Sequence, residues 1–243
     1  MPKKDSAGVP GASPRSPSFP RKSWRSVTLA ALFVRRERWT LTWTGRLLTL
    51  TVLATLTVIL ARGLCGFLAI TSPVGGEFLV VEGWMPGYAY REAATVYRKG
   101  GYRKIIAAGV IKEDGDADGG PPERFGEGLL IGSGVPGDLV AMASSKEAIR
   151  DRTFHSAMAV KQWLHEQGLR NTSIDVVTVG PHARRSRLLY EKALGDEVKV
   201  GVISVEDREF DPNHWWRSSE GVRTVVDESI AYLYARIFFS ISQ

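Results

Sequence analysis

Cysteine and histidine are scarce in this 243-residue chain, which has one cysteine and four histidines. A single cysteine excludes a disulfide framework and a zinc cluster built from cysteines. The chain has no Walker-type phosphate loop, no Gly-x-Ser-x-Gly turn, no His-Glu-x-x-His motif and no repeat of solenoid or propeller period. Because 44% of the residues are hydrophobic and 24% are charged, the composition still predicts a folded protein.

Positive charge is concentrated at the N-terminus. Residues 1–46 contain ten Lys and Arg residues against Asp5 and Glu37, a net charge of +8. The total net charge is +6, so the other 197 residues carry −2. A nucleic-acid-binding domain would need its basic residues on a folded face. We therefore expect no nucleic-acid partner.

The only long apolar run is Leu47–Ile70, in which Arg62 is the single charge. At ~1.5 Å per residue it covers about 36 Å, enough for a hydrocarbon core of ~30 Å. Trp39 and Trp43 fit an interfacial aromatic belt. We expect a disordered, basic tail over 1–40 and a transmembrane anchor over 41–70 that contacts membrane lipid. A buried helix of a soluble protein is the alternative interpretation.

The basic flank of this run predicts its orientation. Ten basic residues precede the run, and none occurs between Thr71 and Gly87. The positive-inside rule then places the N-terminus in the cytoplasm and residues 71–243 outside, as the extracytoplasmic (periplasmic) domain of a single-pass inner-membrane protein. A cleaved signal peptide is the competing interpretation, but both its basic and its apolar region would exceed the usual length.

Beyond the anchor, short β-type runs alternate with amphipathic helical runs. The expected strands are Glu77–Val81, Lys104–Ala108, Leu139–Ala143, Ser173–Val179 and Val198–Ile203. The expected helices are Tyr88–Lys99, Arg152–Gln167, Ala183–Leu194 and Glu220–Phe239. This alternation predicts an α/β fold, a three-layer α/β/α sandwich with a mostly parallel, Rossmann-like sheet.

Ligands of open parallel sheets bind at the carboxyl ends of the strands. His182 follows the fourth expected strand at the start of a helix, where backbone N–H groups favour an anion. Arg184 and Arg185 come next and suit phosphate or carboxylate. Solvated arginines beside a helix N-terminus are the alternative. If chemistry occurs here, the imidazole of His182 is the candidate general acid or base.

Other candidates share this sheet edge. Arg91 stands in the first turn of its expected helix, where the helix dipole disfavours a cation unless an anion lies nearby. That anion could be a ligand in the cleft, or Glu92 or Glu82 in a surface ion pair. Gly109 follows the second expected strand, and Thr153 offers a hydroxyl from the start of the expected helix Arg152–Gln167. In the Trp215–Trp216 pair, packing on the core is favoured over stacking on a sugar or lipid.

Two motif matches do not fit their context. Gly132–Gly137 spells the dinucleotide glycine pattern, but it precedes a strand instead of following one. Asp114–Gly119 matches the start of a calcium loop, but Phe125 stands where a bidentate Glu is needed. No metal site is predicted.

Four pieces of the chain together resemble the ElyC/SanA/YdcF family of bacterial domains of unknown function. They are Leu79–Gly109 with Arg91, the Thr153-containing helix start, Thr178–Ser186, and the tail with Trp215, Trp216 and Glu228. The resemblance implies an inner-membrane protein facing the periplasm, linked to envelope integrity and to peptidoglycan or lipid-carrier metabolism. One soluble relative is associated with S-adenosylmethionine, but no cofactor of this chain follows.

The expected function is a membrane-anchored envelope-biogenesis factor whose outer domain binds an anionic, phosphate-bearing glycan or lipid-carrier ligand. His182, Arg185 and Arg91 would neutralise the anion, and Thr153 would hydrogen-bond it. Glu82, Trp215 and Glu228 are candidate supporting residues. A hydrolase or transferase acting on such a ligand, and a non-catalytic membrane scaffold, are the alternatives.

The orientation can be tested with reporter fusions in a bacterial host. Alkaline phosphatase fused after Gln243 is expected to be active, because it needs the oxidising compartment to form its disulfides. The same enzyme fused after Arg46 is the control and is expected to stay inactive. The reverse pattern would place the domain in the cytosol.

Overall fold

The computed structural model describes residues 41–110, 122–145 and 150–239. The predicted basic tail 1–40 and the acidic pattern Asp114–Gly119 lie outside these described residues. The described chain divides into two units between residues 49 and 50, so most of the first helix belongs with the α/β domain.

The first helix, α1, covers Trp43–Leu68. It is long and apolar enough to cross a membrane. Leu53, Leu56 and Leu60 are among its many exposed apolar side chains, whereas Cys65 and Leu68 are buried. The helix therefore changes its surroundings near residue 61, where it begins to pack against protein.

The α/β fold with an all-parallel sheet is confirmed, and the sheet has the strand order β3-β2-β1-β4-β5. Its strands are β1 (Phe78–Glu82), β2 (Lys104–Val110), β3 (Val140–Ser145), β4 (Thr172–Val179) and β5 (Val198–Val205). The helices that follow α1 are α2 (Gly87–Gly100), α3 (Pro122–Gly132), α4 (Arg152–Glu166), α5 (Ala183–Leu194) and α6 (Ser219–Ile237). Short 3₁₀ turns cover Gly137–Leu139, Gly180–His182 and Pro212–Arg217.

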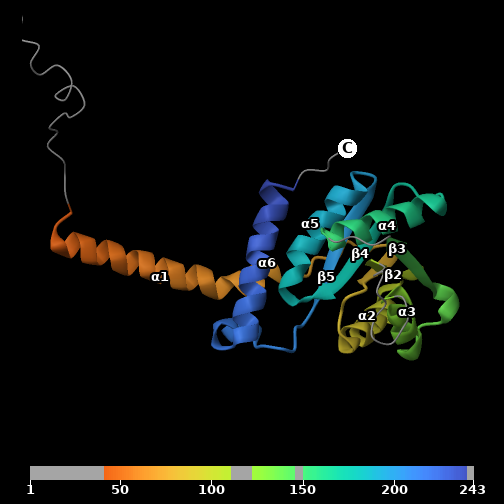
Figure 1. Cartoon of the computed structure of the whole chain (residues 1–243), viewed down its shortest axis with the longest axis horizontal. Helices are drawn as coiled ribbons and strands as arrows, with labels where there is room; N and C mark the ends of the chain where they lie inside the picture. Colours follow the sequence, from red (N-terminus) through yellow and green to blue (C-terminus); the bar gives the residue numbers. More distant parts are fainter. Residues whose placement is uncertain (1–40, 111–121, 146–149, 240–243) are drawn as a thin grey trace, which may run out of the picture. The chain divides into compact units, whose positions relative to one another are not determined.

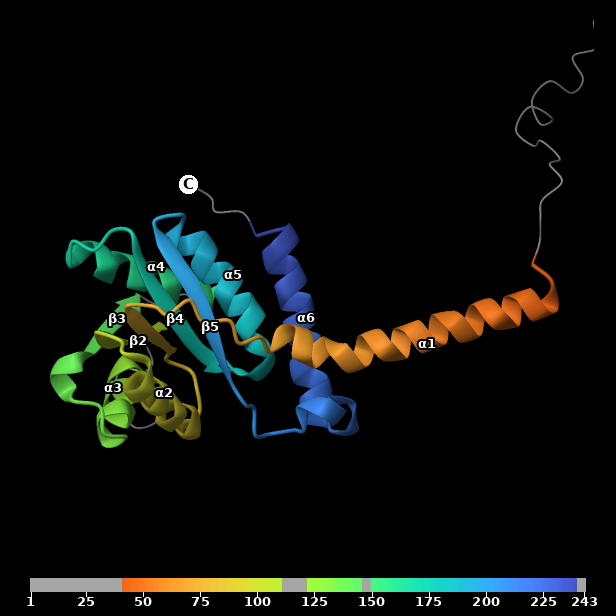
Figure 2. The same cartoon turned by 180° about the vertical axis from the view of Figure 1, so that it is seen from behind.

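Alternating strand side chains build two separate cores. Val80, Ile106 and Val176 point to the face covered by α4 and α5. Their neighbours Leu79 and Val177 point to the opposite face, covered by α2 and α3. The helices thus lie on both sides of the sheet, as Figures 1 and 2 show. Strands buried on both faces explain the nearly unbroken apolar runs in the sequence.

Strand boundaries differ slightly from the prediction. β2 continues to Val110, so Gly109 lies inside the strand, paired with Ser144 of β3, and not after it. β3 begins at Val140 and extends to Ser145. Both strands run further toward the carboxyl edge than predicted, because Gly109 and Val110 of β2 still pair with Ser144 and Ser145 of β3.

A buried carboxylate joins the entry of β1 to β4. Asp175 is fully buried and accepts hydrogen bonds from the backbone N–H groups of Val74 (2.7 Å) and Gly76 (2.8 Å). The hydroxyl of Tyr102 donates to it as well, at 3.1 Å. Burial and the nearby Asp175 charge raise the pKa of Tyr102, so this phenol stays protonated as a donor. Asp175 therefore holds the segment that links α1 to the sheet.

Replacing Asp175 by Ala is expected to lower the free energy of unfolding by about 3 kcal/mol, because buried donors lose a charged acceptor. Urea unfolding of the full chain in detergent micelles measures this. Asp196→Ala, at an exposed turn position, is the matched control. Equal stability of the two variants would contradict the role of Asp175.

Candidate functional site

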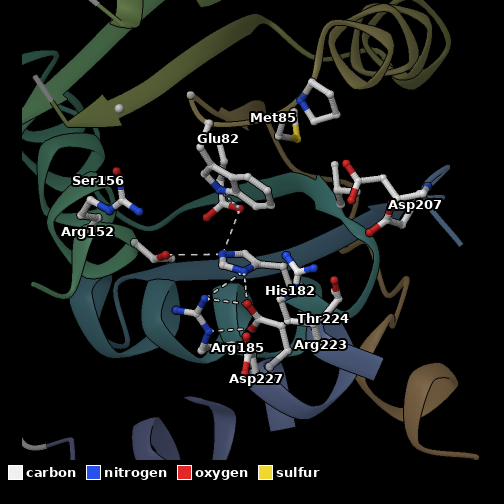
Figure 3. A pocket seen from close by; sticks show the side chains of 18 of the residues that line it. Glu82, Met85, Arg152, Ser156, His182, Arg185, Asp207, Arg223, Thr224 and Asp227 are labelled. Carbon is white, nitrogen blue, oxygen red and sulfur yellow. Dashed lines mark hydrogen bonds and ion pairs between the residues drawn. The ribbon is translucent and has the colours of Figure 1, made fainter. Parts of the chain in front are cut away.

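A cavity of about 820 Å³, here called the edge cavity, opens at the carboxyl edge of the sheet (Figure 3). Residues from the ends of β1, β2 and β4, from the starts of α4 and α5, and from α6 line it. The parallel strands explain this location, since all their carboxyl ends reach the same edge. Gly83 helps to form the floor: a Cβ there would lie 2.9 Å from the carbonyl oxygen of Ala108.

His182 stands at the centre of the edge cavity, at the turn between β4 and α5. The turn is sharp because Gly180 has a φ of +50°, a conformation open to glycine. The imidazole is 11% exposed, and its ring centroid lies 4.6 Å from that of Trp84. Its Nε2 atom is 3.4 Å from the hydroxyl oxygen of Thr153.

Glu228 of α6 binds both His182 and Arg185. Its Oε1 atom is 2.8 Å from Nδ1 of His182. Its two oxygens accept two hydrogen bonds from Arg185, from Nε at 2.8 Å and from Nη2 at 2.9 Å. Such a bidentate ion pair is strong and fixes the orientation of both side chains. We call these three residues the His–Glu–Arg cluster.

Shared contacts within the cluster define two neutral states of the imidazole. Arg185 Nη2 also lies 2.9 Å from Nδ1 of His182, and arginine only donates. When Nδ1 carries a proton it donates to Glu228, and Nε2 presents a lone pair toward Thr153. When Nδ1 is bare it accepts from Arg185, and Nε2 carries the proton instead. In either state Nε2 is the ring nitrogen directed at Thr153 and Glu82.

The charges of the cluster are strongly coupled. Burial alone would raise the pKa of Glu228, but hydrogen bonds from Arg185 and His182 and their charges outweigh burial and lower that pKa to about 2. Burial alone would lower the pKa of Arg185, but Glu228 raises it above its ordinary value. Glu228 is therefore ionised at neutral pH, and the charge of Arg185 is neutralised within the cluster.

Glu82 lines the edge cavity next to His182. It is 2% exposed, and its Oε2 atom lies 3.7 Å from Nε2 of His182. The hydroxyl of Ser186 donates to it, 3.0 and 3.1 Å from its two oxygens, and the indole N–H of Trp84 lies at 3.3 Å. Glu82 and Thr153 therefore face the same ring nitrogen of His182.

The structure brings only some of the sequence candidates together. Glu82, Gly109, Thr153, His182, Arg185 and Glu228 all line the edge cavity. Trp215 is buried elsewhere, and its indole N–H donates to the carbonyl of Ala61 at 3.2 Å.

Arg184 and Arg91 do not line the edge cavity, which corrects the expectation that they share it with His182. Successive residues on a helix point about 100° apart, so Arg184 cannot face the same way as Arg185. Arg184 donates to the carbonyl of Phe67, and its guanidinium lies 3.9 Å from the Phe67 ring centroid. Arg91 is exposed on α2, whose buried side carries Ala89, Tyr90 and Ala93.

Sequence reasoning missed two groups of lining residues. The first is Arg152 and Ser156 of α4, and the second is Glu209 and Asp227, which join Asp207, a residue that follows the fifth strand at the predicted carboxyl edge. Arg152 stands in the first turn of its helix, the same signal that pointed to Arg91. The acidic residues come from the loop after β5 and from α6, so only the fold places them together. Among the described residues, no group of three or more His, Cys, Asp or Glu side chains is arranged to hold a metal ion.

Comparison with known proteins gives no match: neither a protein-family model, nor a curated protein, nor a solved structure is similar to this chain.

The low pKa of Glu228 predicts how stability depends on pH. A carboxylate whose pKa falls from its ordinary 4.5 to about 2 on folding contributes stability above pH 4.5, and this is lost as the pH falls through about 2. Glu228→Gln is expected to destabilise the protein by about 3 kcal/mol at neutral pH, because Arg185 loses its charged partner, and to flatten this acid dependence.

The measurement is the melting temperature of the full chain in detergent between pH 2 and pH 7. Glu220→Gln serves as the control, since Glu220 lies on the same helix and is half exposed. An acid profile of Glu228→Gln that matches that of the control would contradict the coupling.

Proposed function

We propose that the protein is a membrane-anchored envelope-biogenesis factor, similar to the ElyC/SanA/YdcF family. Its α/β domain, held outside the inner membrane by α1, binds a phosphate-bearing glycan or lipid-carrier ligand in the edge cavity. The observation that carries this proposal is the division of the cavity into two chemically different ends around His182.

One end suits a phosphate. Arg152, Thr153 and Ser156 line it from the first turns of α4. No hydrogen bond or ion pair holds the guanidinium of Arg152 within the described parts of the chain, in contrast to Arg185. The N-cap residue Asp151 makes no side-chain cap, so the first N–H groups of α4 also remain for an anion. We assign the phosphate to this end.

The other end suits a sugar. Asp207 lies across the cavity from Arg152 (Figure 3), and Glu209 and Asp227 add two more carboxylates to the lining. Carboxylates accept hydrogen bonds from hydroxyl groups. Trp84 lines the cavity and is 52% exposed, so its ring offers an apolar surface to a sugar. A ligand with a phosphate at one end and hydroxyl groups at the other would fit both ends of the cavity.

A hydrolase or transferase acting on such a ligand is the second candidate, and the orientation of His182 favours it. Glu228 fixes the ring through Nδ1, so that Nε2 lies beside Thr153 at the phosphate end. A carboxylate that orients an imidazole in this way supports its use as a general acid or base. Proton transfer by His182 Nε2 to or from a bound phosphate ester is the step that this geometry allows.

The test uses farnesyl phosphate as a short, soluble stand-in for a lipid carrier. Isothermal titration calorimetry measures the dissociation constant of farnesyl phosphate from the full chain in detergent. Arg152→Ala is expected to weaken binding about tenfold, because one charge-assisted hydrogen bond is lost. Arg91→Ala is the matched control: it removes an exposed arginine outside the cavity and is expected to leave affinity unchanged.

His182→Asn separates the two candidates. Loss of envelope function in a complementation assay, with farnesyl phosphate affinity kept within about twofold, indicates catalysis. Retained envelope function together with intact binding indicates a binding factor. If Arg152→Ala binds farnesyl phosphate as well as Arg91→Ala does, the phosphate assignment fails and a scaffold becomes the better interpretation.

A further inference from the structure

Helix α6 has an outward face that no described part of the protein covers. Val225, Tyr232 and Ala235 turn inward, where they pack on α5 and on the last turns of α1. Opposite them runs an apolar row that is 40–65% exposed. The residues of this outward stripe are Val222, Val226, Ile230, Leu233 and Ile237.

The stripe has the sequence pattern of a helix that lies at a membrane surface. Its members recur at intervals of three and four residues, so they form one continuous face. Arg236 stands at one border, where it can meet lipid headgroups, and Arg223, which pairs with Glu220 at 2.9 Å, stands at the other. Tyr234 and Phe238 add two exposed aromatic side chains next to it. A water-facing helix in a soluble domain would carry polar residues here.

The end of α1 places this stripe near the bilayer. Leu60 is 72% exposed, yet at the next residue the carbonyl of Ala61 already accepts the indole N–H of Trp215. The ring of Phe67 contacts that of Tyr232 on α6, with centroids 5.9 Å apart. Trp43–Leu60 covers about 27 Å at ~1.5 Å per residue, close to a hydrocarbon thickness. The domain thus begins where the span ends.

Arg62 supports the same location. Its guanidinium lies 5.5 Å from the ring centroid of Trp216, which is 36% exposed. Arginine and tryptophan side chains of this kind are typical of the membrane–water interface. Arg62 therefore has a partner at the boundary between span and domain, and it need not lie in the hydrocarbon.

We propose that α6 lies in the membrane interface with its outward stripe among the lipid headgroups and upper acyl chains. The inference rests on the membrane anchor of the proposed function but not on its ligand. The occupant of the stripe is lipid, because the stripe belongs to the helix that packs against the end of the apolar span.

This placement deepens the proposed function by favouring a lipid-borne ligand. Arg223, Thr224, Asp227 and Glu228 of the same helix line the edge cavity. A helix with its side chains is about 10–12 Å across, so this cavity wall lies within that distance of the membrane surface. A ligand whose lipid tail stays in the bilayer can extend its head group past this wall into the cavity, whereas a free nucleotide sugar gains nothing from this arrangement.

The test attaches the environment-sensitive fluorophore NBD to single cysteines in the full chain, in a Cys65→Ala background. Ile230→Cys reports on the stripe, Met158→Cys on an exposed apolar position of α4, and Leu56→Cys on the span. The proteins are reconstituted in phosphatidylethanolamine–phosphatidylglycerol vesicles containing lipids with a doxyl group on the upper acyl chain. Circular dichroism checks that each variant folds.

NBD at Ile230→Cys is expected to emit at shorter wavelength than at Met158→Cys and to be quenched by doxyl lipid at least about twofold more strongly, since interfacial helices lie about 5–10 Å deep. Emission and quenching equal to those at Met158→Cys would overturn the inference. A blue shift that doxyl lipid does not quench, and that grows with the protein-to-lipid ratio, would also overturn it, in favour of a second copy on the stripe. Quenching at Leu56→Cys alone would leave the anchor intact, whereas no quenching at either site would refute the anchor itself.

Discussion

The ion pair between Glu228 and Arg185 is the interaction on which the site depends. Glu228 stands on α6 and Arg185 on α5, and each is mostly buried. A buried charge without a partner is costly, so each helix holds the other in place. The same carboxylate orients His182. One contact between two helices therefore joins α6 to α5 at the cavity and fixes the imidazole.

This pairing also decides which arginine can meet a ligand. Glu228 neutralises Arg185, so Arg185 adds no net attraction for a phosphate. Arg152 has no such partner among the described residues, and it lies beside Thr153 at the start of α4. An anion would therefore be drawn to the α4 end of the cavity. The sequence pattern had instead predicted binding by Arg184 and Arg185, which follow His182.

The fold could be predicted from the sequence because parallel strands buried on both faces appear as nearly unbroken apolar runs between amphipathic helices. The carboxyl edge of the predicted sheet then indicated His182, Thr153, Gly109 and Glu82 as candidate site residues. The sequence did not predict how each helix is rotated about its axis, and therefore which of its side chains face the cavity. Arg184 and Arg185 are adjacent, and only packing decides which of them faces the cavity. Arg91 and Arg152 carry the same first-turn signal, yet only Arg152 lines the cavity. Glu228 lies 46 residues beyond His182, so only the resemblance, and no local pattern, pointed to it.

Helix α6 combines three tasks that usually fall to separate elements. Its inner side packs on α5 and on the end of α1, one border lines the edge cavity, and its outer side is apolar. A strictly structural closing helix would need only the inner side. The exposed apolar row has a cost in water, since it favours association with other apolar surfaces. That cost disappears at a membrane. The proposed attachment through α1 and α6 therefore explains the apolar span, the cavity and the outward stripe together, and it would keep the cavity beside the lipids.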